Sequence, residues 1–410
     1  MQATPTANLV TPDSEGRRYI LAYAAIAGLF AIWGLVQWDF SILLMRFTAY
    51  FGLTRGQSSL ISATFSITYF ALAIPASLLH RRLGFKLGVT FALSISALGP
   101  FLIYPSITEH GYGYFLGAVA VMGMSWPLLE TSLNPLAAAA GPRRPAVSRV
   151  NLVQAFSSVG LAAGYFVGEW LIPTNFDWSI KTLAASKALP FVAVGMAILV
   201  LAFLIDKVPF PADPVRGRLR DEISALWRDR FFRFFVLAIF VFQLAQSIIW
   251  SATVAYTMQE LPGTTPGFGV KMLVVCGVLY ALGRFGGAAL MTRIAPAKLL
   301  AVSLAIAVVL MVPAAALGGT TGLGCLIAMS LFMAITYPTL FGLAVRDLGA
   351  TAKLASGVLV TATGLGAFLA PIFLTISQGP ARFAILTAVP CLLAVLACAV
   401  YVSRTKPETL

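Results

Sequence analysis

Apolar runs of about 20 residues recur along the whole chain, separated by short polar segments. A run of this length crosses the roughly 30 Å hydrocarbon core of a bilayer as an α-helix. The pattern predicts membrane-spanning helices at about 19–45, 57–80, 87–106, 113–139, 147–172, 187–206, 231–256, 269–291, 299–318, 322–345, 354–377 and 381–402. The expected fold class is therefore an all-α membrane protein with twelve transmembrane helices.

The composition excludes the common classes of soluble enzyme. Hydrophobic residues make up 59% of the 410 positions and charged residues 10%, whereas soluble domains carry about 25% charged residues. The chain has no phosphate-binding glycine loop with Lys, no zinc spacing and no nucleophile elbow. Its four cysteines lie in apolar segments, as small core residues do. We expect no enzyme, metal or cofactor site, and uphill transport would draw on an ion gradient or on the solute itself.

The basic residues are distributed unevenly between the predicted loops. Twelve spans place both termini on one side, and that side carries 21 of the 28 Lys and Arg residues, whereas the opposite side carries six. This bias predicts that both termini face the cytoplasm of a bacterial inner membrane. The net charge of +13 is then attracted to anionic lipid of the inner leaflet, and no nucleic-acid partner is expected.

A long polar loop divides six predicted spans from six. We predict a cytoplasmic tail at 1–18 without a cleavable signal, a six-helix half at 19–206, a linker at 207–230, a second six-helix half at 231–402 and a tail at 403–410. The second part of the linker has the pattern of an amphipathic surface helix. Two six-helix halves joined by a long loop resemble the plan of major facilitator transporters, in which the substrate lies between the halves near the midplane.

Polar residues inside the predicted spans are candidates for the transport chemistry. On span four, Trp126, Glu130 and Asn134 recur at i, i+4 and i+8 and share one helix face. Pro127 should kink the helix there. Glu130 is either a structural hydrogen-bonding group or, unpaired in a low-dielectric site, a proton carrier. We favour the proton carrier because no obligate basic partner occurs in the first six spans.

Amides recur on spans five and seven. Asn151 and Gln154 either bond a neighbouring helix or hydrogen-bond a polar solute. Gln246 and Trp250 are spaced i and i+4, with Gln243 one turn earlier. An amide beside an indole suits a sugar, because hydroxyls need donors and acceptors while C–H faces stack on aromatic rings. Trp250 by itself is equally consistent with core packing.

Two further charges lie within predicted spans. Asp39 on span one is either functional or paired locally with Arg46. Gln37, a candidate substrate-binding residue like its neighbour Trp38, belongs to a different face of that helix, about 200° away from Asp39. Arg284 on span eight is expected to be a buried structural cation, satisfied by carbonyls or by a carboxylate.

The segment "LETSLNP", followed by "RVNLVQAF", resembles the signature of the fucose–galactose–glucose/proton symporter family within the major facilitator superfamily. The resemblance continues in "GRFGGAALMTRIAP", "TAKLASGVLV" and "ITYPTLFGLAVRDLG", the last of which contains Tyr337, a further candidate substrate-binding residue. It implies a role for Glu130 in sugar and proton coupling and pairs Gln154 with it. The spacing of Gln246 and Trp250 looks like that of L-fucose permeases.

Two positions depart from the family pattern. The family's "NNLND" is "QWDFS" here, which puts Ser41 where its protonatable Asp would be and Asp39 two residues earlier. Ser157 stands where the family has Asn. Trp38 beside Asp39 favours a larger or less hydroxylated ligand than fucose. Both Asp39 and Glu130 are therefore retained as candidate proton-coupling residues.

The resemblance and the residues together predict a secondary active transporter that carries a fucose-like hexose or related polyol with protons, by alternating access. The alternative within transport is a facilitator or exporter of a different small polar or amphipathic metabolite, with weakened or absent proton coupling. A non-transporting receptor on the same scaffold is the other class considered. The expected partners are a small solute, a proton and membrane lipid, and the expected oligomeric state is a monomer.

Overall fold

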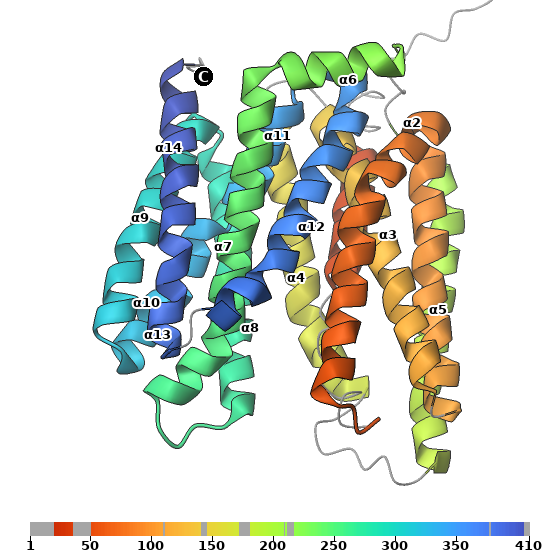
Figure 1. Ribbon diagram of the computed structural model, residues 1–410. Helices are drawn as coiled ribbons and strands as arrows, with labels where there is room; N and C mark the ends of the chain where they lie inside the picture. The colour runs from red at the N-terminus through yellow and green to blue at the C-terminus, as the bar shows by residue number, and fades with distance from the viewer. Residues whose placement is uncertain are drawn as a thin grey trace, which may run out of the picture.

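The computed structural model describes residues 20–35, 51–109, 111–140, 146–171, 181–208, 210, 217–376 and 379–405, and all regular secondary structure in these ranges is helical (Figure 1). The first helix is Ile20–Leu35. The others are α2 (Arg55–Thr108), α3 (Tyr112–Ala139), α4 (Ala146–Leu171), α5 (Lys181–Leu204), α6 (Leu219–Arg228), α7 (Arg230–Glu260), α8 (Pro266–Leu290), α9 (Pro296–Ala316), α10 (Gly319–Met333), α11 (Thr336–Val345), α12 (Ala352–Ile376), α13 (Ala381–Ala384) and α14 (Val389–Thr405).

Eight of the described helices are long and apolar enough to cross a membrane. One of them, α2, contains both the second and the third predicted spans. Its 54 residues, at about 1.5 Å each, are far longer than one crossing requires. The chain reverses at Gly84, whose φ of 87° is a conformation that glycine adopts without steric cost. Residues 36–45 of the predicted first span lie outside the described residues.

Two helical bundles lie side by side (Figure 1). The N-terminal bundle contains Ile20–Leu35 and α2 to α5, and the C-terminal bundle contains α7 to α14. The bundles meet where α2 packs against α12 and where α4 packs against α8 and α11. The short helix α6 runs across one end of the molecule, the end at which α14 finishes (Figure 1).

Glycines allow the bundles to approach closely near this end. A Cβ atom on Gly357 of α12 would lie 2.2 Å from the Oγ of Ser77 on α2. A Cβ on Gly342 of α11 would lie 3.1 Å from the Cα of Val147 on α4. The Ser148 hydroxyl adds a hydrogen bond of 2.8 Å to the carbonyl oxygen of Ala288 in the other bundle. The two bundles are therefore closed against each other toward the end where α6 lies.

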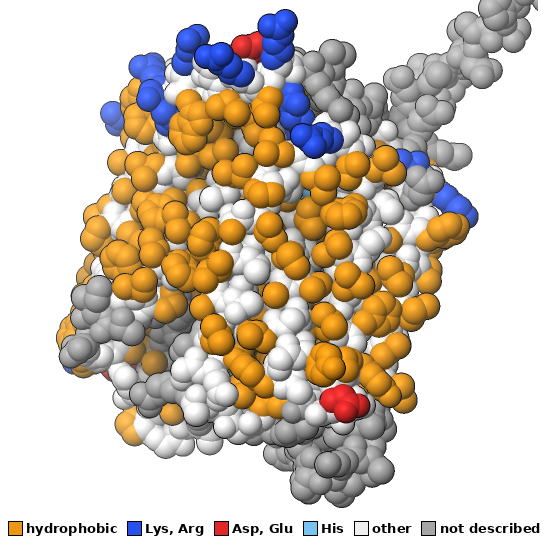
Figure 2. Space-filling model, turned by 45° about the vertical axis from the view of Figure 1, so that its right-hand side comes forward, with side chains coloured by type: hydrophobic (Ala, Val, Ile, Leu, Met, Phe, Trp, Pro, Cys, Tyr) orange, Lys and Arg blue, Asp and Glu red, His pale blue; other side chains and the backbone are white. Residues whose placement is uncertain are grey.

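The outer surface is apolar, as lipid contact requires. Large side chains such as Phe203, Val309 and Leu317 are 64–70% exposed. Figure 2 shows a broad belt of hydrophobic side chains below a cluster of Lys and Arg side chains at one end. Patches of this extent are unusual on soluble monomers. The fold is that of a multi-pass membrane protein, with its polar groups either at the ends or between the bundles.

Candidate functional site

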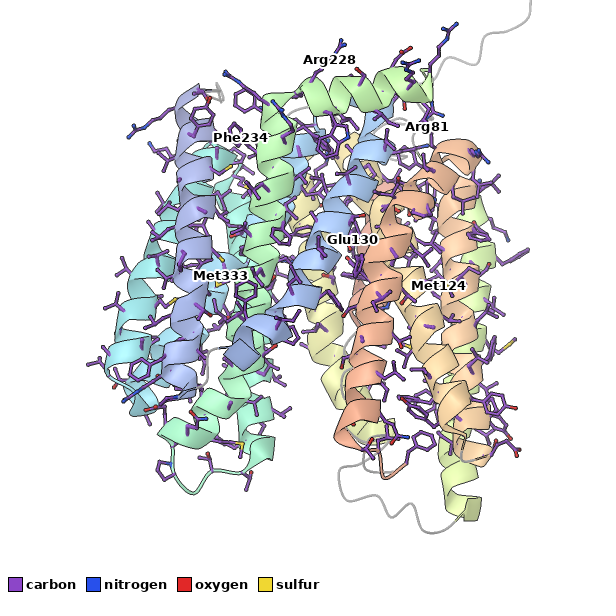
Figure 3. The ribbon with its side chains drawn as sticks, viewed as in Figure 1. Arg81, Met124, Glu130, Arg228, Phe234 and Met333 are labelled. Atoms are coloured by element: carbon purple, nitrogen blue, oxygen red, sulfur yellow. The ribbon has the colours of Figure 1, made fainter. Side chains whose placement is uncertain are left out.

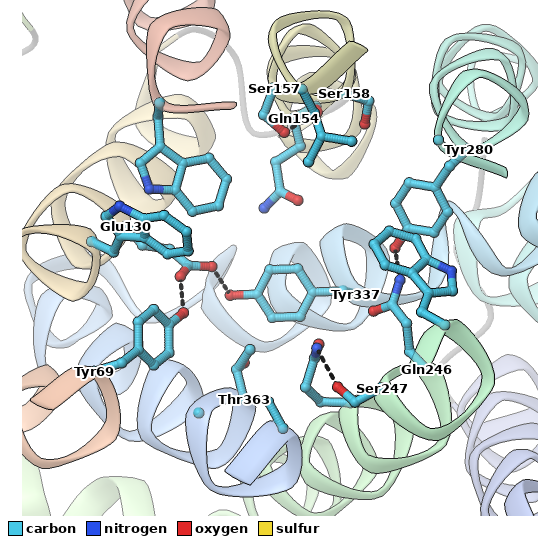
Figure 4. A pocket seen from close by; sticks show the side chains of 18 of the residues that line it. Tyr69, Glu130, Gln154, Ser157, Ser158, Gln246, Ser247, Tyr280, Tyr337 and Thr363 are labelled. Carbon is cyan, nitrogen blue, oxygen red and sulfur yellow. Dashed lines mark hydrogen bonds between the residues drawn. The ribbon is translucent and has the colours of Figure 1, made fainter. Parts of the chain in front are cut away.

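A cavity of about 210 Å³ lies between the two bundles. Nine of the residues named from the sequence line it: Trp126, Glu130, Gln154, Ser157, Gln243, Gln246, Trp250, Arg284 and Tyr337. They come from α3, α4, α7, α8 and α11, so both bundles contribute to one site (Figure 4).

Glu130 is the acidic residue among the described residues that line the cavity. Its side chain on α3 is 5% exposed and accepts two hydrogen bonds, one from the Tyr69 hydroxyl on α2 and one of 2.5 Å from the Tyr337 hydroxyl on α11 (Figures 3 and 4). Tyr337 belongs to the opposite bundle, so the carboxylate joins the two. None of the ion pairs between described residues includes Glu130.

The local sequence of α3 brings Glu130 to this position. Gly123 lies two turns earlier, where a Cβ would meet the Thr68 hydroxyl at 2.0 Å. This close approach of α3 to α2 brings Tyr69 within reach of the carboxylate. Pro127 cannot donate a backbone hydrogen bond, and its own carbonyl accepts one of 2.6 Å from the Thr131 hydroxyl.

Gln154 on α4 faces the same space as Glu130. Its Nε2 donates a 2.8 Å hydrogen bond to Oδ1 of Asn134, which leaves the carbonyl oxygen of the Gln154 amide free of that contact. Asn134 is fully buried and is not among the described residues that line the cavity. Asn134 thus accepts from Gln154 and orients it, and direct contact of Asn134 with the solute stays a prediction.

Asn151 also lies away from the cavity. Its Nδ2 donates to the Val147 carbonyl at 3.0 Å and to the Thr339 hydroxyl of the other bundle at 3.1 Å, and it contacts Sδ of Met291 at 3.4 Å. The cause is its position one turn nearer the closed end than Gln154. Asn151 therefore makes a contact between the bundles, the alternative that the sequence left open, and solute binding by Asn151 stays a prediction.

Tyr280 organises the wall that the C-terminal bundle contributes. Its hydroxyl accepts a 2.7 Å hydrogen bond from Nε2 of Gln246. Its ring makes an edge contact with Trp250, at 5.2 Å between centroids and 74° between planes. The guanidinium of Arg284 lies 4.6 Å from the centroid of the same ring, within the range of a cation–π interaction. One tyrosine therefore contacts three predicted site residues.

Arg284 is buried, with 8% of its surface exposed. Its Nη1 donates to the backbone carbonyl oxygen of Gln154 at 2.8 Å and to the hydroxyls of Ser157 and Ser158, each at 3.1 Å. Its Nε donates to the carbonyl of Ala334 at 3.3 Å. Neutral oxygens thus satisfy this cation, and most of them belong to the opposite bundle. This arrangement agrees with the structural role expected for Arg284, although the side chain also lines the cavity.

Aromatic side chains form the facing wall in the N-terminal bundle. Trp126 makes edge contacts with Phe65 at 4.5 Å and with Trp33 at 5.8 Å between ring centroids. The cavity therefore has an apolar surface on each side and hydrogen-bonding groups between them. Gln243, one turn before Gln246, also lines it and donates to the Ser247 hydroxyl at 3.4 Å.

Several of these residues were not found by sequence reasoning. Tyr69 and Thr363 also line the cavity. They occur in apolar segments that hold many similar residues, and no local spacing marks them. Tyr280 offered a weak signal, because it precedes Arg284 by one helical turn. The predicted residues Gln37, Trp38 and Asp39 lie outside the described residues. No group of three potential metal ligands occurs in the part of the chain that the structure describes.

Comparisons with known proteins agree with this architecture. The model of the family "Major Facilitator Superfamily" matches residues 18–371. The chain is 32% identical over 401 residues to an L-fucose-proton symporter of Escherichia coli (strain K12), a match that covers 92% of each chain. It is 30% identical over 373 residues to a glucose/galactose transporter of Brucella abortus biovar 1 (strain 9-941), covering 89% of this chain and 90% of the relative.

Solved structures show the same relationship. The crystal structure of a Major Facilitator Superfamily transporter, FucP, in the outward conformation superposes with a TM-score of 0.86 at 31% identity, covering 94% of this chain and 99% of that one. The human organic anion transporter MFSD10 shares the fold at 17% identity, with a TM-score of 0.70. The predicted fold class and the resemblance to the fucose–galactose–glucose/proton symporters are confirmed. The chain belongs to the major facilitator superfamily.

Proposed function

We propose that the protein is a secondary active transporter that carries a monosaccharide together with a proton by alternating access. The observation that carries this proposal is Glu130, a buried carboxylate that faces the cavity and accepts hydrogen bonds from both bundles. The similarity to an L-fucose-proton symporter and to glucose/galactose transporters supports it. The solute class is a fucose-like hexose or a related polyol.

The lining of the cavity suits a solute with several hydroxyl groups. The amides of Gln154 and Gln246 use their Nε2 atoms on Asn134 and Tyr280, so their oxygens are available to accept from solute hydroxyls. Trp126 and Trp250 offer ring faces or edges to the C–H surface of a sugar. The volume of about 210 Å³ lies below the roughly 300–1,000 Å³ typical of sites for drug-sized ligands, which favours a single small sugar.

Glu130 couples the proton to movement of the bundles. When ionised, the carboxylate accepts from both tyrosine hydroxyls. When Glu130 is protonated, one of its oxygens becomes a donor and the hydrogen bonds from the tyrosines are no longer made to an ionised acceptor, which weakens them. Because Tyr337 is the partner in the other bundle, protonation weakens a link between the bundles. Asp39 is a second candidate proton site, and its position lies outside the described residues.

Energy comes from the proton gradient, without a cofactor. We place both termini and the linker at 207–230 in the cytoplasm of a bacterial inner membrane, on the basis of the Lys and Arg bias. In this orientation the bundles are closed against each other on the cytoplasmic side. The two proposed six-helix halves are residues 19–206 and 231–402. A monomer would be sufficient, because the cavity is formed within one chain.

The experiment that tests this function uses proteoliposomes with a pH-sensitive dye outside. Addition of L-fucose, D-galactose or D-glucose should alkalinise the external medium if solute and proton enter together. Radiolabelled uptake in the same vesicles reports solute movement separately. Uptake without any proton movement would support the facilitator alternative, and a lack of both with every sugar would refute the proposed solute class.

A further inference from the structure

The helix α6 carries an exposed apolar stripe that no other described segment covers. Leu219, Ile223 and Trp227 occur at intervals of four residues and are 37%, 41% and 48% exposed. Successive residues of a helix are about 100° apart, so these three side chains occupy a sector of about 80° on one side of α6. Glu222 and Leu226 are buried against the protein, and they occupy the sector of the helix next to Leu219.

The charged residues of α6 are sorted around this stripe. Arg220 is only about 20° from Trp227 around the helix, so it flanks the stripe, whereas Asp221 is about 160° from Ile223. Arg228 is about 140° from Ile223 and extends from the outer side of α6 (Figure 3). The helix thus places a cation beside its apolar stripe and keeps its exposed carboxylate on the opposite side.

Both ends of α6 are fixed, which sets its height relative to the membrane-spanning helices. Arg81 at the turn within α2 donates to both carboxylate oxygens of Glu222, at 2.9 and 3.2 Å, and to the carbonyl of Gly217. The pair joins the first turn of α6 to the turn within α2. At the other end Asp229 caps α7, accepting a 2.8 Å hydrogen bond from the Phe231 amide.

The stripe ends beside the start of α7. The ring of Trp227 makes an edge contact with Phe232 of α7, at 6.3 Å between ring centroids, and Phe234 and Leu237 further along α7 are 45% and 58% exposed. Tryptophan is enriched at the boundary between membrane and water, where its ring is apolar and its N–H remains hydrated. Figure 2 shows basic side chains at this end directly above the hydrophobic belt.

We propose that α6 is a membrane-interface helix whose stripe inserts between the headgroups of the adjacent leaflet and whose Arg220 binds the phosphate of an anionic phospholipid. In the orientation proposed above this is the cytoplasmic leaflet. An amphipathic helix with a basic flank has the chemistry for such a surface. The inference depends on placement in a membrane and not on which solute is carried.

Quenching of Trp227 fluorescence tests the proposal in the full-length protein reconstituted into vesicles. The signal of Trp227 is the difference between the wild type and Trp227→Phe. Phospholipids brominated near the headgroup should quench this signal, and brominated phosphatidylglycerol should quench more strongly than brominated phosphatidylcholine at equal mole fraction. Arg220→Gln should reduce that preference roughly fivefold, in line with the contribution of one arginine near an anionic surface, and Arg220→Lys should restore most of it.

Arg228→Gln is the matched control, because it removes the same charge from the outer side of the same helix and should leave the preference unchanged. Thermal unfolding of each variant verifies that the fold is intact. A Trp227 signal that neither brominated lipid quenches would overturn the proposal and indicate water or a protein partner at the stripe. Equal quenching by the two lipids in the wild type, or equal effects of Arg220→Gln and Arg228→Gln, would overturn the headgroup assignment.

Discussion

Replacing Tyr280 with Phe tests how the C-terminal bundle recognises the solute. The change keeps the ring that contacts Trp250 and Arg284 but removes the hydroxyl that accepts from Gln246. Gln246 lines the cavity, and without the Tyr280 hydroxyl its Nε2 donor loses its fixed partner. The unanchored amide must then be ordered each time the solute binds, and we expect weaker binding.

The size of the effect follows from the contact that is lost. A neutral hydrogen bond contributes about 0.5–1.5 kcal/mol, and an unsatisfied buried donor costs about 1–3 kcal/mol. Because the cavity admits water beside Gln246, the lower part of this range applies. A loss of about 1 kcal/mol corresponds to a roughly fivefold increase in Kd. The turnover number at saturating solute should change little, since Tyr280 makes no described contact with Glu130.

Isothermal titration of the purified protein with the transported sugar measures this Kd, and thermal unfolding measures stability in parallel. Tyr256→Phe is the matched control. Tyr256 is also a fully buried tyrosine of the C-terminal bundle, but its hydroxyl donates to the Ala314 carbonyl, away from the cavity. This control should lower stability without changing Kd. An unchanged Kd in Tyr280→Phe, with a stability loss like that of the control, would refute the positioning role.

Three further predictions concern the proton, the aromatic wall and the contact between bundles. Glu130→Gln should bind and exchange solute across the membrane but fail to accumulate it, and its binding should lose pH dependence; full accumulation would move coupling to another residue. Trp250→Ala should weaken solute binding by about 1–3 kcal/mol if the indole contacts the solute, whereas normal affinity with reduced yield would assign Trp250 to packing. Gly357→Val should destabilise the closed contact of α12 with Ser77 by about 1–3 kcal/mol. It should lower transport more than Gly324→Ala does, because a Cβ on Gly324 would meet nothing within 4 Å. Equal transport in both variants would contradict this.

Hydropathy predicted the spanning helices well because the bilayer imposes their length. It was less informative about interruptions within them. The tenth predicted span is two helices, α10 ending at Met333 and α11 beginning at Thr336. Such breaks depend on a few backbone angles, which leave little trace in an average over 20 residues.

The site was predictable where burial in lipid makes a residue type costly. Glu130 and Arg284 were found for that reason, and both line the cavity. Tyr69 and Tyr280 were not, because tyrosine is common in apolar helices and their partners are 61 and 34 residues away in the chain. Asn151 shows the same limit, since a helix face is visible in the sequence but the helix that it meets is not.

The two charged groups of the cavity give the transport cycle an electrical property. Among the described lining residues, Arg284 carries a positive charge that neutral oxygens hold, and in the function proposed above Glu130 binds and releases the proton. The net charge of Arg284 and Glu130 is zero when Glu130 is ionised and +1 when Glu130 is protonated. A membrane potential does about 2.3 kcal/mol of work per elementary charge for each 100 mV. A potential that is negative inside therefore drives the loaded, protonated carrier inward, while the empty carrier returns without opposing the field.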